Sequence, residues 1–359
     1  PDASTIWFNP AGLTDLQGEQ IVIGTHYIIP HSKFTNDGSS AATILGSSPL
    51  TGDDDDGGSP AVVPNFYWAK QIDEDLSFGM GFNAPFGLAT EYDDDWVGRY
   101  HAVISDLRIV NFNPSLGYRI SDNLSVGGGV NMMLADVILS RVIDFGAICV
   151  AQFTPSICQG LGALPQGADG YGDLTGDNLD DISLGYNLGL KIKLTDSISL
   201  GFSYRSEVDV EVDGEADFSV PSAASFVFDG DLFLDTGLQA EVTLPASFSI
   251  SYANQVDNLT YLADITWTGW SSFQELVIEY DNPAQPDSIE LYEWDDVYRY
   301  SVGIDWQYED DTIYRFGLSY DESPVPDAER RTPRLPGNDR TWVSLGFNVK
   351  ATKYMSIDV

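Results

Sequence analysis

Strict alternation of apolar and polar residues over 182–194 is the sequence feature that most restricts the fold. Every even position from Ile182 to Leu194 is apolar, and nearly every odd position is small or polar. A repeat of two residues is the pattern of a β-strand whose two faces meet different surroundings. The segment is also longer than the roughly 5–6 residues usual for a strand. Because the alternation returns over 107–120, 198–212, 297–308 and most of the chain between them, we expect an all-β protein.

The connections between these segments are alternately short and long. Short turns fall near 73–75, 121–123, 195–197, 257–258, 309–311 and 352–353. Long links fall near 30–60, 89–105, 143–180, 213–240, 281–295 and 322–339. An up-and-down outer-membrane barrel has this order, with short turns at its periplasmic end and long loops outside.

Two all-β folds compete at this point. A soluble sandwich buries its apolar strand faces, whereas a transmembrane barrel turns them outward to lipid. On the apolar face of 297–308, Tyr298 and Tyr300 lie at one end and Trp306 and Tyr308 at the other, as the aromatic girdles of a membrane barrel would. We therefore predict a transmembrane antiparallel up-and-down β-barrel. A helical span is excluded, because mean hydropathy is -0.12 and no run of 18 apolar residues occurs.

Residues 1–18 lack strand alternation, and we expect them to form a short hatch inside the barrel. Pro10 suits the start of a helical turn, and Asn9 suits its cap. Residues 19–359 are assigned to the barrel, with about thirteen strands. Since single-chain bacterial barrels normally have an even number of strands, we expect fourteen, the last lying beyond Val359 and the thirteenth cut short. The hatch is likewise expected to be truncated at its start.

The net charge of -38 argues against nucleic acid or anionic lipid as a partner. The acids gather in predicted loops such as 53–56 and 93–95, which fits solubility in a salty medium. A further acidic stretch, at positions 169, 173, 177, 180 and 181, fits no EF-hand spacing, so a solvated loop is favoured over calcium bridging of loops or lipopolysaccharide. We expect no metal site and no cofactor.

No catalytic arrangement stands out, and we do not expect an enzyme. The three histidines, His26, His31 and His101, belong to no nucleophile or metal motif. Cys149 and Cys158 lie close together and could form a disulfide in an oxidising compartment, although spacing alone leaves their pairing open.

Several segments, in order along the chain, resemble the FadL/TodX family of outer-membrane importers of long-chain fatty acids and aromatic hydrocarbons. The segment 4–13, with Asn9, Pro10 and Ala11 at its centre, is similar to the hatch signature of that family. The segments 83–92, 204–208 and 334–342 also match, the first of them resembling the third strand of the family and the link after it.

The resemblance implies a fourteen-stranded barrel with an N-terminal hatch, in the bacterial outer membrane. It implies capture of a hydrophobic ligand among the external loops, passage to an inner site, and lateral exit into the membrane through a gap where the third strand kinks. The expected partners are a fatty acid or hydrocarbon and outer-membrane lipid or lipopolysaccharide, with the protein acting as a monomer.

The residues expected at the gap are Asn83, Pro85, Phe86 and Gly87. Proline cannot donate to a strand ladder and glycine weakens one, so pairing should fail here. From the residues alone, an ordinary bulge or a strand end at the rim is an equal alternative.

Three arginines on predicted inner faces, Arg205, Arg299 and Arg315, are candidates for holding a ligand carboxylate. For Arg205, a salt bridge to its strand neighbours Glu207, Asp209 and Glu211 is the favoured alternative, and the other two carry the same ambiguity. The excess of acids makes a neutral hydrocarbon somewhat more attractive as the substrate. Two other functions stay open: a structural or adhesive barrel whose acidic loops bind cations, and a porin for polar solutes.

Overall fold

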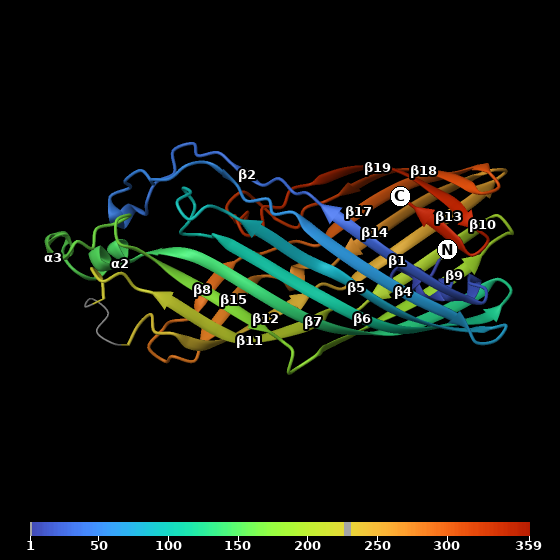
Figure 1. Ribbon diagram of the computed structural model, residues 1–359, viewed down its shortest axis with the longest axis horizontal. Coiled ribbons are helices and arrows are strands. Elements are labelled where there is room, and N and C mark those ends of the chain that lie inside the picture. Colours follow the sequence, from blue (N-terminus) through green and yellow to red (C-terminus); the bar gives the residue numbers. More distant parts are fainter. Residues whose placement is uncertain (1, 226–230) are drawn as a thin grey trace.

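The computed structural model describes residues 2–225 and 231–359, and it is an elongated barrel whose strands run along its length (Figure 1). The helical elements are α1 Thr5–Phe8, η1 Pro10–Asp15, η2 Thr43–Leu45, α2 Phe145–Gln152, α3 Pro155–Leu161 and η3 Trp270–Ser272. The first ten strands are β1 Glu19–Ile28, β2 Lys33–Phe34, β3 Asp55–Asp56, β4 Ala61–Gln71, β5 Leu76–Glu91, β6 Ile104–Ser121, β7 Leu124–Asp144, β8 Asp169–Asp177, β9 Ser183–Lys193 and β10 Ile198–Arg205. The other ten are β11 Val208–Ser219, β12 Thr236–Leu244, β13 Ser247–Val256, β14 Leu259–Thr268, β15 Glu275–Tyr280, β16 Ser288–Leu291, β17 Val297–Glu309, β18 Thr312–Asp321, β19 Arg340–Thr352 and β20 Met355–Asp358.

All registered strand pairs are antiparallel, and neighbours along the chain are neighbours in the wall. The main series runs β1, β4, β5, β6, β7, β9, β10, β13, β14, β17, β18, β19, β20. A second series, β8, β11, β12, β15 and β16, continues several of these strands beyond the main wall and joins it through the far half of β7. This is the up-and-down order that the alternating connection lengths predict.

In the main wall, polar side chains face inward and apolar side chains face outward. On β9, Ser183 and Asn187 are buried, whereas Leu184 and Leu188 are exposed. This confirms the two-faced strand expected over 182–194. On β17, the stacked rings of Tyr298 and Tyr300 and the contacting rings of Trp306 and Tyr308 lie at the two ends of an exposed apolar stretch. The faces are those of a barrel wall surrounded by lipid.

Beyond the main wall the two faces exchange places. On β11, Val208, Val210 and Val212 are buried inside, while Asp209 and Glu211 are exposed. The prediction of one continuous strand over 198–212, with its valines on the same face as Leu200 and Phe202, is therefore wrong.

The exchange has a local cause. Residues 206 and 207 leave the strand ladder between β10 and β11, so the residues that follow face the opposite side. Ser206 stays attached to the neighbouring strand, because its N–H donates to the Tyr186 carbonyl at 2.9 Å and its Oγ accepts from the Tyr186 N–H at 3.0 Å. Comparable interruptions separate β8 from β9 and β12 from β13.

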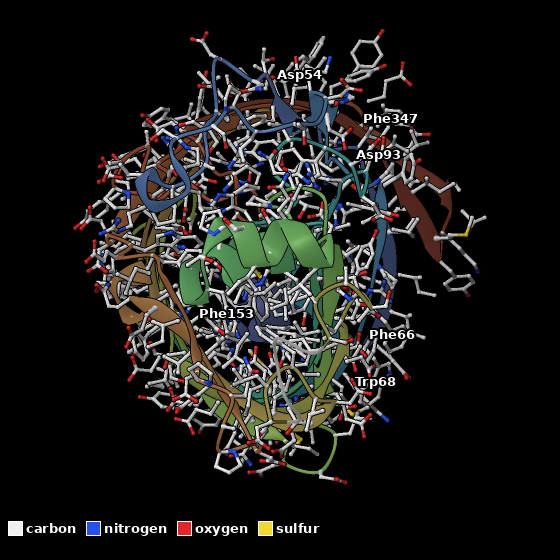
Figure 2. The ribbon with its side chains drawn as sticks, turned by 90° about the vertical axis from the view of Figure 1, so that its left-hand side faces the viewer. Asp54, Phe66, Trp68, Asp93, Phe153 and Phe347 are labelled. Atoms are coloured by element: carbon white, nitrogen blue, oxygen red, sulfur yellow. A yellow bond between two sulfur atoms is a disulfide. The ribbon has the colours of Figure 1, made fainter. Side chains whose placement is uncertain are left out.

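The second series of strands also corrects the expected loop lengths. The links predicted near 143–180, 213–240 and 281–295 contain β8, parts of β11 and β12, and β16. Among these strands, β11 places its acids outside and its valines inside, as a sheet in water must, whereas Glu290 of β16 faces the lumen. We infer that they rise above the lipid as a water-facing extension of the barrel. The rim beyond them carries acidic loops, among them Asp54 and Asp93 (Figure 2).

Helices α2 and α3 form a cap across the mouth of the barrel (Figure 2). Asp144 caps α2 by accepting from the Ala147 N–H at 2.8 Å. A disulfide joins Cys149 of α2 to Cys158 of α3, and both lie in a buried cluster with Phe145 and Ala168. No helix in the described ranges has the length and apolar character needed to cross a membrane.

The exchange of faces can be tested with a matched pair of substitutions. Val302 lies between the two aromatic ends of β17 and is 57% exposed, so Val302→Arg would place a charge in lipid. We expect it to lower the free energy of unfolding by about 2–4 kcal/mol. Glu211→Arg on the exposed face of β11 should stay within about 0.5 kcal/mol of the parent. Equilibrium denaturation in lipid vesicles measures both, and equal costs would contradict the placement of β11 outside the membrane.

Candidate functional site

The hatch consists of α1 and η1, and its Asn9 fastens it to the barrel. As predicted, Asn9 caps the turn that Pro10 begins: its Oδ1 accepts from the Ala11 N–H at 3.1 Å. Its Nδ2 donates across to the carbonyls of Leu190 on β9 and Phe202 on β10, at 3.1 and 3.2 Å. One side chain therefore both shapes the hatch and attaches it to two strands.

Glycines on the inner wall let the hatch approach closely. A Cβ added at Gly127 of β7 would lie 2.4 Å from the Pro10 carbonyl carbon. One added at Gly189 of β9 would lie 2.2 Å from Asn9 Oδ1. Such distances leave no room for a methyl group. The Asn-Pro-Ala segment therefore fits against strands whose inward positions carry no side chain.

Polar contacts hold the far end of the hatch. Lys191 of β9 forms an ion pair with Asp15, and Arg119 of β6 donates to the Thr14 carbonyl. The Thr14 hydroxyl donates to Ser125 Oγ at 2.8 Å. These contacts fix the position of η1 inside the polar part of the lumen.

Arg205 also holds the hatch, in a way that the sequence did not predict. The face of its guanidinium lies 3.4 Å from the centre of the Trp7 ring. Its two terminal nitrogens donate to Asn131 Oδ1 at 2.5 Å and to the Trp7 carbonyl at 2.7 Å. The alternative of a salt bridge to Glu207, Asp209 or Glu211 is wrong, because the break at 206–207 turns Asp209 and Glu211 outward, and no ion pair to Arg205 occurs among the described residues.

The other two candidate arginines lie elsewhere in the barrel. Arg315 on β18 lies 3.8 Å from Asp305 Oδ2 and also pairs with Asp358, so it has carboxylate partners of its own. Arg299 on β17 lies opposite Asp321 in the register with β18. The structure therefore does not bring the three predicted arginines together into one site.

Strand β5 leaves the ladder on one side near the residues predicted for a gap. Its pairing with β4 ends at Phe82, opposite Phe66. Farther along, β4 from Asn65 to Ala61 is registered with β1. On the other side, the register of β5 with β6 shifts between Asn83 and Phe86, which is a bulge at Pro85.

We call the opening between β4 and β5 the window. It is bounded below by the pair Phe66 and Phe82, and above by the bridge between Gly58 and Thr90. Within the described strands, 83–89 has no registered partner on the β4 side. Each edge carries a proline, Pro64 or Pro85, which has no N–H to donate. The sequences of both strands therefore disfavour pairing in this part of the wall.

The lumen behind the window is apolar, in contrast to the polar lumen around the hatch. Its buried side chains form a cluster that we call the middle lumen, made of Ile109, Met133, Ala135, Val208, Val210, Val212 and Leu244. Phe86 packs against this cluster from β5 and meets the ring of Trp270 edge-on, with ring centres 6.0 Å apart. The chain thus places an apolar compartment beside the window.

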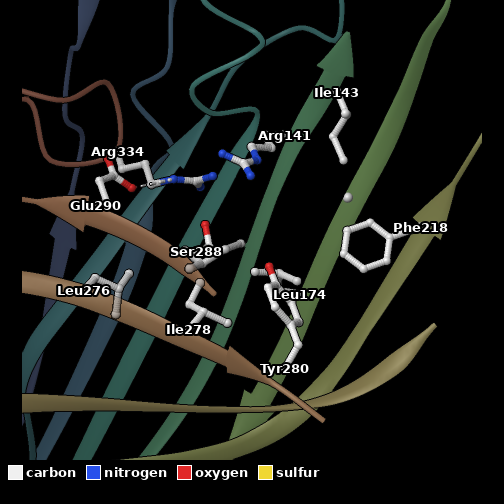
Figure 3. A pocket seen from close by; sticks show the side chains of 12 residues that line it. Arg141, Ile143, Leu174, Phe218, Leu276, Ile278, Tyr280, Ser288, Glu290 and Arg334 are labelled. Carbon is white, nitrogen blue, oxygen red and sulfur yellow. Dashed lines mark ion pairs between the residues drawn. The ribbon is translucent and has the colours of Figure 1, made fainter. Parts of the chain in front are cut away.

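A small cavity continues this compartment toward the cap (Figure 3). Its volume is about 30 Å³, and its aliphatic and aromatic lining includes Leu139, Leu174, Phe218, Leu276, Ile278 and Tyr280. At one end lie Arg141, Arg334 and Glu290, with Arg334 Nε 3.7 Å from Glu290 Oε2. These three charged residues were missed in the sequence. Arg141 could have been found, because it shares the odd-numbered inner face of β7 with Asn131.

The two arginines of the cavity differ in how they are held. Arg334 is buried, and it donates to the Ile104 carbonyl, the Ser105 hydroxyl and the Ser140 carbonyl at 3.0, 2.9 and 3.2 Å. Burial lowers the pKa of Arg334, and the carboxylate of Glu290 opposes that shift. Arg141 is exposed toward the lumen and has no ion-pair partner within the described ranges. Arg141 is therefore the cation that is free to meet a ligand.

The first part of the acidic stretch at 169–181 is a strand rather than the solvated loop expected, whereas Asp180 and Asp181 lie in an exposed turn. Residues 169–177 form β8, and Asp169 is bound by Arg99 at 3.2 Å and by the Tyr100 hydroxyl at 3.0 Å. No group of three or more His, Cys, Asp or Glu side chains arranged to hold a metal ion occurs in the described part of the chain.

Together, the lipid-facing wall, the internal hatch and the apolar middle lumen define an outer-membrane transport barrel. The chain belongs to the family described as outer membrane protein transport protein (OMPP1/FadL/TodX), which matches residues 1–359. This is the FadL/TodX family of outer-membrane transporters for long-chain fatty acids and aromatic hydrocarbons, as the sequence resemblance predicts.

Relatives match the chain over nearly its whole length. A long-chain fatty acid transport protein of Escherichia coli O6:H1 is 28% identical, over 100% of this chain and 80% of its own. A 47 kDa outer membrane protein of Pasteurella multocida is 30% identical, over 99% and 80%. Among solved structures, a Pseudomonas aeruginosa FadL homologue has a TM-score of 0.86 at 23% identity, covering 99% of this chain and 84% of that one. The Pseudomonas putida toluene transporter TodX has a TM-score of 0.70 at 20% identity, covering 99% and 86%.

Adjacent glycines provide a test of the hatch cradle. Gly127 faces Pro10, whereas a Cβ on Gly128 would meet only ordinary contacts at 3.4 Å or more. Overpacking costs about 1–3 kcal/mol, so Gly127→Ala should loosen the hatch and speed labelling of a Thr14→Cys thiol about tenfold. Gly128→Ala is the control and should not change the rate. Maleimide labelling of the folded protein measures this, and similar rates in both variants would contradict the cradle.

Proposed function

We propose that this protein is a passive transporter of hydrophobic molecules. They enter from the cell exterior, reach the middle lumen and pass sideways through the window into the membrane. The observation that carries the proposal is the position of the apolar middle lumen directly beside the one interruption in the pairing of β4 with β5. A ligand in that compartment would find apolar side chains behind it and lipid beyond the window.

The cap supplies the place of first contact. Phe153, Ile157 and Leu164 are 42%, 49% and 44% exposed on or beside its two helices. Exposed apolar side chains gathered at the mouth of a barrel would bind an apolar ligand from water. From there the cavity lined by Leu139 and Phe218 leads toward the middle lumen. Because that cavity holds only about 30 Å³, entry of a ligand requires side chains to move apart.

Sideways exit is the favourable direction for such a ligand. Each methylene group moved from water into hydrocarbon gains about 0.8 kcal/mol. Continuing down the lumen would instead carry the ligand against the hatch and the polar side chains around it, such as Asn131 and Asn187. Lipid on the far side of the window removes that penalty. The protein then needs no energy source, because the bilayer is the thermodynamic sink.

The cavity favours an amphipathic carboxylate as the substrate. Its wall is apolar, and its charged end carries two arginines against one glutamate. The relatives include transporters named for long-chain fatty acids and for toluene, so the family alone leaves the choice open. Most of the acids responsible for the charge of -38 can lie in the loops and the outer face of the extension without lining this cavity. One chain supplies the hatch, cavity and window, so we propose that a monomer surrounded by lipid and lipopolysaccharide suffices.

Removing the bulge tests lateral exit. Deleting Ala84 takes out the extra residue of β5, so that Asn83 and the residues beyond the bulge can pair in one register with β6. We expect uptake of labelled oleate and of toluene to fall together, because the window closes. Gly128→Ala on β7, whose Cβ would meet only contacts at 3.4 Å or more and which lies outside the window, is the control. Unchanged uptake of both compounds by the deletion variant would rule out the window as the exit.

A second substitution tests the substrate class. Arg141→Met keeps the length of the side chain and removes its charge. We expect the apparent affinity for oleate to fall by roughly tenfold, as the loss of a hydrogen bond between charged groups would cause. Uptake of toluene, which carries no charge, should stay at the parental level. Equal losses for both would indicate a steric role, and open-channel conductance in planar bilayers would point to a porin instead.

A further inference from the structure

A row of buried polar side chains crosses the inner wall between the window and the hatch. We call it the polar belt; its members, in order across five strands, are Asn83 of β5, Asn111 of β6, Asn131 of β7, Asn187 of β9 and Arg205 of β10. Each is at most 9% exposed. Buried amides and guanidinium groups are costly unless they are hydrogen-bonded, so their grouping at one level of the barrel needs a reason.

The members of the belt are joined by hydrogen bonds. The Asn111 amide donates to Asn83 Oδ1 at 3.1 Å and to Asn131 Oδ1 at 3.3 Å. Arg205 donates to the same Asn131 oxygen at 2.5 Å. The Asn131 amide in turn reaches Asn187 Oδ1 at 3.5 Å. A continuous path of side-chain contacts therefore runs from β5 to β10.

The two ends of this path are the two parts of the protein that transport would have to move. Asn83 is the first residue of β5 beyond its last pair with β4, so it lies at the lower corner of the window. At the other end, Arg205 donates to the Trp7 carbonyl at 2.7 Å, and Asn187 donates to the Ile6 carbonyl at 3.4 Å. Trp7 and Ile6 belong to α1 of the hatch.

The belt is not fully satisfied where it meets the window. Asn111 Oδ1 is buried and has no hydrogen-bond partner among the described atoms. A network with one open acceptor is poised to rearrange, because a change at one member alters the partners available to the next. Arg205 and Asn111 both donate to the same oxygen, Asn131 Oδ1. Arg205 stays on β10, but if its guanidinium turns away to follow the hatch, that oxygen keeps only the hydrogen bond from Asn111.

We propose that Arg205 is a positioning residue that couples the hatch to the window through the polar belt. Its guanidinium stacks on the Trp7 ring and donates a hydrogen bond from one nitrogen to the Trp7 carbonyl of the hatch. The other nitrogen donates to Asn131 of the belt. Displacement of α1 changes the hydrogen bonding of Asn131, then of Asn111, and so removes one of the hydrogen bonds that hold Asn83 at the window, the other being to Tyr67. The inference rests on the proposed exit through the window, but its test does not depend on uptake.

The test follows two reporter thiols in the otherwise full chain, reconstituted in lipid vesicles. Since both native cysteines are joined in a disulfide, an added cysteine is the one free thiol among the described residues. Ala84→Cys reports on the window and is labelled by a lipid-soluble maleimide. Thr14→Cys reports on the hatch and is labelled by a water-soluble one. To confirm that each variant is folded, we would test whether its barrel resists unfolding in cold detergent, as the parent protein does.

Arg205→Met should speed labelling at both reporters, by about tenfold for the loss of hydrogen bonds made by a charged group. Asn111→Leu breaks the belt between Arg205 and the window and leaves the Arg205 contact with Trp7 in place. In that background Arg205→Met should still speed labelling of the hatch, but it should change labelling of the window by no more than about twofold. This loss of additivity is a result that a purely structural role of Arg205 would not produce.

Lys191→Met supplies the matched control. Lys191 also holds the hatch, through Asp15, but its side chain makes no hydrogen bond or ion pair with the belt among the described residues, so its loss should speed labelling of the hatch and leave the window unchanged. If Arg205→Met fails to fold, Arg205→Lys keeps the charge and can make only one of the two bonds at a time, and the same pattern is expected. The proposal is overturned if Arg205→Met leaves window labelling at the parental rate. It is equally overturned if the window effect persists with Asn111→Leu, since direct packing of Ile6 on Gly79 and Gly81 would then carry the coupling.

Discussion

Hydrocarbon offers no hydrogen bonds to a backbone, and this constraint governs the rest of the structure. It explains the long antiparallel registers of the main wall and the outward apolar faces of strands such as β9 and β17. It also makes the end of the pairing between β4 and β5 informative. Where β5 leaves β4 beyond Phe82, unpaired backbone is placed beside lipid, and prolines at both edges reduce the number of N–H groups left without a partner.

The second consequence is the exchange of faces above the lipid. Once the strands enter water, the side chains must invert, and short interruptions such as 206–207 bring this about without ending the barrel. The lumen therefore has two levels: polar around the hatch, where Asn131 and Asn187 point inward, and apolar above, where Val208 and Val210 do. The boundary between the levels coincides with the window. Where the outer face of the barrel meets lipid, the lumen is polar, and where the outer face meets water, the lumen is apolar.

Alternation over 182–194 and 107–120 predicts strands, faces and topology because strand periodicity is local and lipid enforces it. The same local rule placed Arg205 inside correctly, but it gave Arg205 the wrong neighbours, because Asp209 and Glu211 face outward. Apolar residues stay on even positions from Leu200 through Val210, so the inversion at Ser206 leaves no change of parity in the sequence, only one polar residue at an even position. The cavity was missed for a different reason. Arg334 lies in a link that has no periodicity, and its partners Ser105 of β6 and Ser140 of β7 are 229 and 194 residues away in the chain.

The polar belt also bears on the direction of transport. An apolar ligand in the middle lumen has the belt beneath it, and passing the belt would mean separating hydrogen-bonded amides without offering partners in return. The window beside it requires no such exchange, because the ligand moves from apolar side chains to lipid. A floor of hydrogen-bonded polar groups and an opening in the wall at the same level therefore act together: the first makes downward movement unfavourable, and the second leaves sideways movement as the route that remains.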